Sequence, residues 1–159
     1  VNLNKALEQF EQQVEEAKDT QSLMLSEARL TKTLYKIICT VTGYNDFSRV
    51  KQGAGTDSAN RFLDHGNYLA YGLGATATWV LGLPHGLSVL HGKTRRGGLV
   101  FDAADLVKDA VVLPQAFLSA MNGDTEQEFR QACIGAVRQS EALDFMIDSL
   151  KSISEECSA

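Results

Sequence analysis

The sequence predicts an all-α protein, a compact multi-helix domain. Apolar residues recur at helical spacing, only 2 of the 159 residues are proline, and side chains typical of helix caps precede several apolar segments. The β-branched pair at residues 111–112 is too short to indicate a strand. The length is sufficient for one domain with a sizeable core, so we predict a single domain over residues 1–159.

Two helices are predicted at the start of the chain, over residues 3–18 and about 22–42. The first has Gln and Glu on the face opposite its apolar residues, which are Leu3, Leu7, Phe10, Val14 and Ala17. Gly43 supplies a C-terminal stop for the second. Residues 43–56 contain Asn-Asp and Gly-Ala-Gly, which predict a loop.

A third helix is predicted over residues 58–81, with candidate N-caps at residues 56–58. Its glycines lower helix propensity but allow neighbouring helices to approach closely. Residues 66–90 carry no Asp, Glu, Lys or Arg and are long enough to cross a bilayer. Five glycines and Pro84 interrupt them, so we interpret them as a buried helix and a turn.

The remaining chain is predicted to be helical apart from one basic loop. A short helical piece follows Pro84 and ends near His91, and the loop H-G-K-T-R-R-G-G begins there. Helix resumes over residues 100–121, with an interruption at Pro114.

A capping box of Thr125 and Glu128 then opens one last helix, which extends to about Leu150.

The net charge of −5 is unevenly distributed. Residues 1–21 carry two basic and five acidic side chains, and residues 124–156 carry three basic and eight acidic ones. Residues 22–123 carry ten basic and seven acidic side chains, so this middle segment has a positive net charge. A charged ligand responds to the local field, so the positive middle permits a nucleic-acid partner. Ordinary scatter of surface charge explains the distribution equally well.

The three cysteines, Cys39, Cys133 and Cys157, lie far apart, and no C-x-x-C occurs. This pattern argues against a disulfide framework or a zinc ribbon. The chain opens without a signal-peptide pattern. We therefore expect a cytoplasmic protein with reduced thiols and no attachment to a membrane.

The sequence comes close to two known catalytic motifs but matches neither of them. Leu90 stands where a G-x-S-x-G nucleophile motif needs its last glycine. Leu87 stands where a P-loop needs its first glycine. Neither a serine hydrolase nor a P-loop nucleotide site is expected.

A more promising group consists of His91, Asp102 and Asp105, because the loop between them can bring them together. The two carboxylates are three residues apart and share a helix face, with Lys108 one turn further. With one more oxygen ligand they would suit Mn²⁺ or Mg²⁺. The alternative is a solvated helix face. Glu27 is the candidate for the fourth group, although a surface salt bridge explains it as well.

Four segments in order resemble the CRISPR adaptation integrase family. They read S-E-A-R-L-T-K, then D-S-A-N-R-F-L-D-H-G-N-Y, then G-L-P-H-G-L-S-V-L-H-G-K, and finally F-D-A-A-D-L-V-K. The longer segment over residues 83–102 resembles the subtype I-F branch of that family. The resemblance covers residues 20–150.

This resemblance implies a catalytic Mg²⁺ or Mn²⁺ site. The family's metal-binding Glu, His and Asp match Glu27, His91 and Asp105, and His85 is only a neighbour. Asp102 is implied as a supporting group and Asn60 as a supporting or packing residue. The basic residues implied to contact DNA phosphates are Lys93, Arg95, Arg96 and Lys108, with a solvated turn as the alternative for the loop.

The resemblance also implies an activity and partners. The 3′-hydroxyl of captured DNA attacks a phosphodiester at the repeat boundary of a CRISPR array. The expected partners are DNA, a second copy in the full-length homodimer, and the second adaptation protein, which subtype I-F fuses to a helicase–nuclease. The family's N-terminal β domain is absent from this chain, so we expect a C-terminal fragment of a longer protein. The alternative function is a non-catalytic helical scaffold that binds proteins through its acidic terminal helices.

Overall fold

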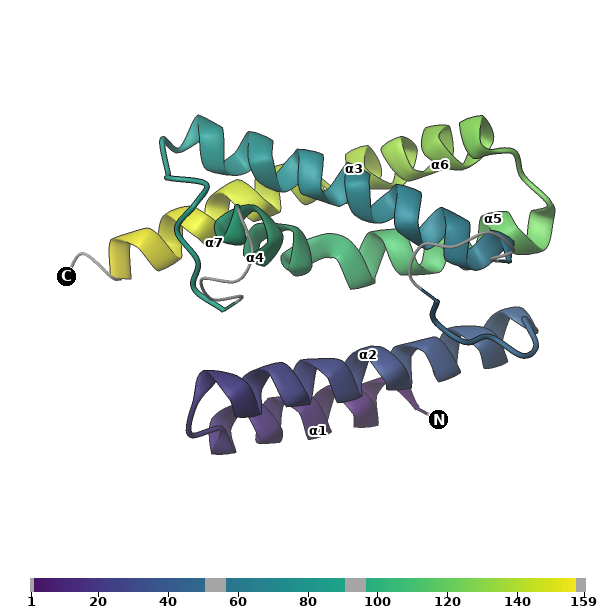
Figure 1. Ribbon diagram of the computed structural model, residues 1–159, viewed down its shortest axis with the longest axis horizontal. Helices are drawn as coiled ribbons and strands as arrows, with labels where there is room; N and C mark the ends of the chain where they lie inside the picture. Colours follow the sequence, from purple (N-terminus) through teal and green to yellow (C-terminus); the bar gives the residue numbers. More distant parts are fainter. Residues whose placement is uncertain (1, 51–56, 91–96, 157–159) are drawn as a thin grey trace. The chain divides into compact units, whose positions relative to one another are not determined.

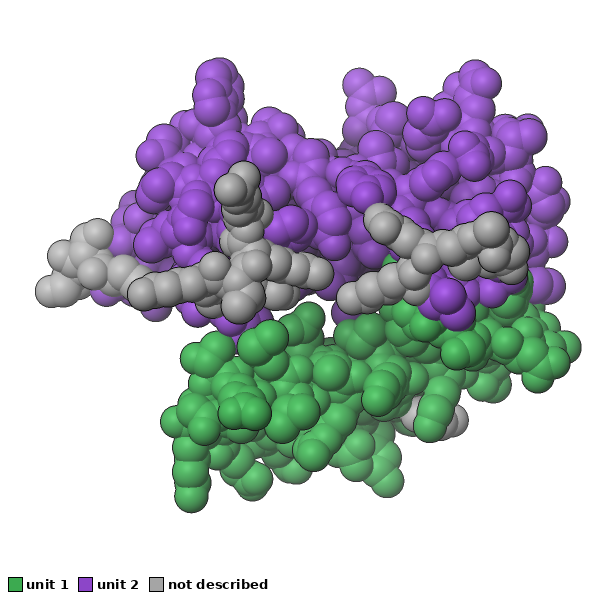
Figure 2. Space-filling view, in the orientation of Figure 1, with its two compact units in different colours: residues 1–49 green, residues 50–159 purple. Residues whose placement is uncertain are grey.

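The computed structural model describes residues 2–50, 57–90 and 97–156 (Figure 1). These three ranges contain helices and no strand, which confirms the all-α prediction. The chain divides into two compact units, residues 1–49 and 50–159 (Figure 2). Within the described ranges, no helix has both the length and the apolar character needed to cross a membrane.

The first unit is a pair of packed helices, α1 (Leu3–Glu16) and α2 (Thr20–Thr42). The second helix begins two residues earlier than predicted because Asp19 is its N-cap, in a capping box with Ser22. The backbone N–H of Ser22 donates to the Asp19 carboxylate at 2.7 Å, and this bond lowers the pKa of Asp19. Gly43 ends the helix in the left-handed conformation (φ 73°), as predicted.

The second unit is built around α3 (Ser58–Val80), which contacts every other helix of the unit (Figure 1). Asp57 is its N-cap. The partners of α3 are α4 (Gly98–Val107), the π-helical segment η2 (Lys108–Val112), α5 (Leu113–Asn122), α6 (Glu126–Gln139) and α7 (Ala142–Glu156). The central position explains why α3 carries almost no charge on its buried face, which includes Ala59, Phe62, Gly66, Ala70, Gly74 and Ala77.

Two glycines of α3 allow the close packing that the sequence predicted. A Cβ built on Gly74 would lie 2.5 Å from the backbone oxygen of Val100, so α4 touches the backbone of α3 at this point. A Cβ on Gly66 would lie 2.3 Å from Cγ1 of Val112. These contacts fix α4 and η2 directly against the central helix.

Two groups of apolar side chains pack the helices of the second unit together. Phe62 of α3 stacks on Phe129 of α6, with ring centroids 4.6 Å apart. A second buried cluster joins α3, α4 and α7 through Ala77, Leu99, Ala103, Val107, Ala142, Met146 and Leu150. The helix that carries Asp102 and Asp105 is therefore held between α3 and α7.

Three local predictions differ from the structure. Residues 83–90 form turns rather than a helical piece. The Leu87 N–H donates to the Pro84 carbonyl oxygen in a single turn, and the N–H groups of Val89 and Leu90 donate to α4 instead of continuing a helix. The predicted interruption at Pro114 is a π-helical widening over residues 108–112, in the turn before it, where the proline has no N–H to donate.

The third difference concerns the last predicted helix, which is two helices, α6 and α7. Glu141 adopts the left-handed conformation (φ 52°) and separates them. The break allows α7 to bury Ala142, Met146 and Leu150. The start of α6 is as predicted, with the Thr125–Glu128 capping box formed.

Candidate active site

The two aspartates of α4 begin the candidate site. Asp102 and Asp105 lie three positions apart in the sequence, which places them on one face of the helix. The Oδ2 atom of Asp102 accepts hydrogen bonds from the backbone N–H groups of Val89 (2.8 Å) and Leu90 (3.1 Å). The chain immediately before His91 is therefore attached to the helix that carries both carboxylates.

Two further contacts hold residues 85–90 along the first turn of α4. The Leu99 N–H, one of the donors that a helix start leaves open, donates to the carbonyl oxygen of His85 at 3.3 Å. Gly98 lies so close to Ser88 that a Cβ on Gly98 would be 2.5 Å from the serine Cβ. The side chain of His85 is exposed, so this residue contributes its backbone to the docking.

Asp105 is partly buried and forms an ion pair with Lys108. The Nζ atom of Lys108 lies 2.5 Å from Oδ1 of Asp105, and the two side chains are 22% and 19% exposed. Lys108 is the first residue of η2, directly after the helix that carries Asp105. The sequence predicted a phosphate contact for Lys108, and the structure adds its ion pair with the predicted metal ligand.

Asn60 is fully buried and fixes the start of α3. Its side-chain oxygen accepts from the Val50 N–H at 2.9 Å, and its amide nitrogen donates to Oδ2 of Asp57 at 2.8 Å. The Asn60 backbone N–H completes the arrangement by donating to Oδ1 of Asp57. These bonds give Asn60 a structural part in the second unit, within the supporting or packing role predicted for it.

The other predicted site residues lie elsewhere in the chain. Glu27 is half-buried on α2, in the first unit, whereas Asp105 belongs to the second unit. The remaining predicted residues, His91, Lys93, Arg95 and Arg96, are outside the described residues. Among the described residues alone, no group of three or more His, Cys, Asp or Glu side chains could hold a metal ion.

The chemistry of the predicted donors nevertheless fits a hard divalent ion. Glu27 and Asp105 supply carboxylate oxygens and His91 an imidazole nitrogen, a set that suits Mg²⁺ or Mn²⁺. The partly buried carboxylate of Asp105 already has a cation beside it, the Lys108 ammonium. A divalent ion bound to this oxygen would take the place of the ammonium.

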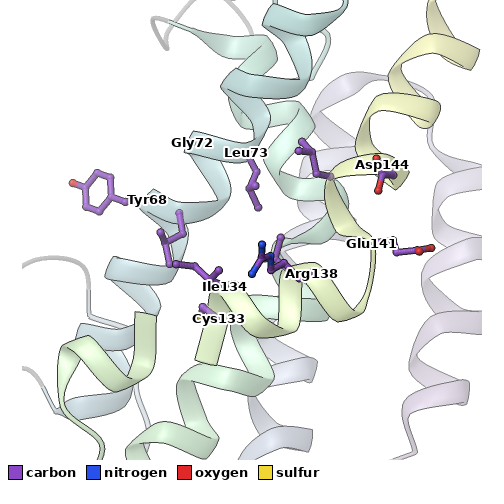
Figure 3. Close-up of a pocket in the computed structure, with 11 residues that line it drawn as sticks. Tyr68, Gly72, Leu73, Cys133, Ile134, Arg138, Glu141 and Asp144 are labelled. Atoms are coloured by element: carbon purple, nitrogen blue, oxygen red, sulfur yellow. The ribbon is translucent and has the colours of Figure 1, made fainter. Parts of the chain in front are cut away.

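The second unit also contains an apolar groove that involves none of the predicted site residues. It has a volume of about 740 Å³ and is lined by α3, α6 and the start of α7. Leu73 points toward Arg138 across it (Figure 3). Burial raises the pKa of Cys133, which lines the groove, to about 11, so its thiol stays protonated and is a poor nucleophile.

Comparison with known proteins gives a consistent family. The family model described as "CRISPR associated protein Cas1" matches residues 2–143. The chain is 62% identical over 150 residues to the CRISPR-associated endonuclease Cas1 of Pseudomonas aeruginosa, covering 94% of the chain and 46% of that protein. It is 58% identical over 157 residues to the Pectobacterium atrosepticum protein of the same name, covering 99% and 48%. The chain spans about half the length of these relatives.

Solved structures show the same fold. A crystal structure of a TtCas1–DNA complex superposes with a TM-score of 0.79 at 21% identity, over 94% of this chain and 59% of that chain. A crystal structure of TtCas1 gives 0.74 at 25% identity, over 85% and 51%.

Proposed function

Because this chain belongs to the Cas1 family of CRISPR-associated proteins, we propose that it is the helical catalytic part of a divalent-metal-dependent DNA integrase of CRISPR adaptation. The observation that carries the proposal is the family match over residues 2–143, together with 62% identity to a CRISPR-associated endonuclease. The relatives from Pseudomonas and Pectobacterium fit the predicted subtype I-F branch. DNA is the proposed substrate, and the complete protein is proposed to act in the cytoplasm as a homodimer with the helicase-fused adaptation protein.

In this proposal Glu27, His91 and Asp105 hold a Mg²⁺ or Mn²⁺ ion. When bound, the ion orients the attacking hydroxyl and neutralises charge that develops on the phosphoryl oxygens. The proposal is supported by the docking of residues 85–90 on α4, the helix of Asp105, because His91 directly follows this docked segment in the sequence.

The proposed reaction is a transesterification. The 3′-hydroxyl oxygen of captured DNA bonds to a phosphorus atom at the repeat boundary, and the bond from that phosphorus to its 3′-oxygen breaks. One phosphodiester replaces another, so no nucleotide needs to be hydrolysed, in agreement with the incomplete P-loop motif. Lys108, Lys93, Arg95 and Arg96 hold the DNA through its phosphates, which positions the strand without reading its sequence.

A strand-transfer assay tests this function. The complete gene product is incubated with a labelled DNA fragment and a CRISPR-repeat target, with Mn²⁺ or Mg²⁺ or with a chelator. We expect labelled target only with the metal and only from fragments with a 3′-hydroxyl. Joining in the chelator would refute metal dependence, and a complete protein that neither joins nor nicks DNA would refute the enzyme.

A complete protein that neither joins nor nicks DNA would favour the alternative function, a non-catalytic scaffold. Such a scaffold would bind proteins through the acidic terminal helices, and the apolar groove between α3, α6 and α7, where Tyr68 and Ile134 are well exposed, would add a second contact surface.

The basic loop yields a prediction about DNA affinity. Changing Lys93, Arg95 and Arg96 together to alanine should weaken binding to every DNA sequence, because phosphate contacts are sequence-independent. Each lost duplex contact should make the slope of log affinity against log salt shallower by about 0.9. A salt titration of DNA binding measures this slope.

A matched control removes the same charge elsewhere. Lys5, Lys18 and Lys151 are exposed and far from the loop in sequence, so their triple alanine variant should keep the wild-type slope. Equal slopes for both triple variants and the wild type would mean that the loop does not meet DNA.

A further inference from the structure

The segment before His91 has an unusual mode of attachment. Residues 83–90 form no helix. Leu83 packs against the core cluster of α3, α4 and α7, but Leu87 and Val89 are 55% and 69% exposed, so apolar packing holds residues 85–90 weakly. Its described attachments to α4 are the Leu99–His85 backbone bond, the close contact of Gly98 with Ser88, and the two bonds to Asp102. The bonds to Asp102 lie at the end of the segment that continues into His91.

The carboxylate of Asp102 suits this task. It accepts two adjacent backbone N–H groups on one oxygen, at 2.8 and 3.1 Å, and bonds to a charged acceptor are about twice as strong as neutral ones. Asp102 itself stands on a helix that is held by α3 and α7. Asp102 therefore ties the backbone of Val89 and Leu90 to the core of the second unit.

We propose that Asp102 is a positioning residue, which anchors on α4 the backbone of Val89 and Leu90, the two residues that precede His91 in the sequence. It acts through these amides and not as a ligand of the ion. The inference rests on the proposed function only in its second half, the use of His91 in metal binding. The anchor itself stands on the hydrogen bonds of the described residues.

Two substitutions separate anchoring from ligation. Asp102→Asn keeps an oxygen that can accept both N–H groups but removes the negative charge that a metal ligand supplies. Asp102→Ala removes both. Asp148→Ala, at an exposed position of α7, is the control for loss of one carboxylate from a helix.

The experiment has two readouts on the complete gene product. Hydrogen–deuterium exchange of peptides that contain Val89 and Leu90 reports on the anchor, and Mn²⁺ binding reports on the site. We expect Asp102→Ala to speed exchange at these two amides at least tenfold and to weaken Mn²⁺ binding by about 10- to 100-fold, as for other residues that orient a ligand. Asp102→Asn keeps the accepting oxygen but loses the strength that its charge adds, so both readouts should lie between wild type and Asp102→Ala. Asp148→Ala should stay within about threefold of wild type in both readouts.

Two results would overturn the proposal. Unchanged exchange in Asp102→Ala would show that the anchor does not operate in solution. Loss of Mn²⁺ binding in Asp102→Asn with normal exchange would make Asp102 a ligand through its charge. His91→Ala separates the proposals, because it should abolish Mn²⁺ binding and leave the exchange of Val89 and Leu90 unchanged. A wild-type protein that binds no Mn²⁺ would refute the metal site, and the exchange data would still decide the anchor.

Discussion

Replacing His91 by alanine should lower the rate of metal-dependent strand transfer by at least about 100-fold, because it removes a proposed ligand outright and loss of a residue that merely orients one costs 10- to 100-fold. The same change at His85 should leave activity within about threefold of wild type, since alanine keeps the carbonyl oxygen that accepts from Leu99. The two histidines are six residues apart in one segment, which makes them a matched pair.

The readout is the strand-transfer rate of the complete protein, with circular dichroism as a check on helical content. Both variants should keep the wild-type spectrum. The described fold does not use the His85 side chain, which is exposed, and the role proposed for His91 is to bind the ion. The reverse outcome, an inactive His85 variant and an active His91 variant, would mean that the motif match is displaced by one histidine.

Gly74→Ala should lower the free energy of unfolding by about 1–3 kcal/mol, the usual cost of overpacking a core. The added methyl group would lie 2.5 Å from the Val100 oxygen and 3.2 Å from the Ala104 nitrogen, and both atoms belong to the backbone of α4. Neither can rotate away, so α4 has to move from α3. Since α4 carries Asp102 and Asp105, strand transfer should slow as well.

Gly72 on the same helix provides the control for this prediction. A Cβ at Gly72 meets nothing within 4 Å. Gly72→Ala should therefore raise stability by about 0.5–1 kcal/mol through helix propensity alone. Urea unfolding of both variants measures the difference, and a Gly74 variant as stable as the Gly72 variant would contradict the close packing of α3 and α4.

Periodicity and caps predicted most of the fold. The starts of α3 and α6 and the end of α2 follow from Asp57, Thr125 and Gly43, whose local chemistry determines a helix end regardless of distant contacts. The break at Glu141 was not predicted, because neither Ser140 nor Glu141 is a typical helix breaker. It follows from the packing of α7, which no local pattern records.

The shared helix face of the two aspartates was predictable from the sequence, but the backbone groups that bond to Asp102 were not. The spacing of Asp102 and Asp105 predicted a shared helix face, and that face is present. The amides of Val89 and Leu90 left no signal, because every residue except proline carries the same N–H group. The ion pair of Lys108 with Asp105 could have been predicted from the sequence, since side chains three positions apart on a helix lie next to each other.

The most direct test of the metal site is a crystal structure of the complete protein with Mn²⁺ and its anomalous signal. We predict one anomalous peak with carboxylate oxygens of Glu27 and Asp105 and a ring nitrogen of His91 at about 2.0–2.3 Å. Asp102 should remain bonded to the amides of Val89 and Leu90. A peak bound by other residues, or one that leaves Glu27 far from His91, would contradict the assignment of the site.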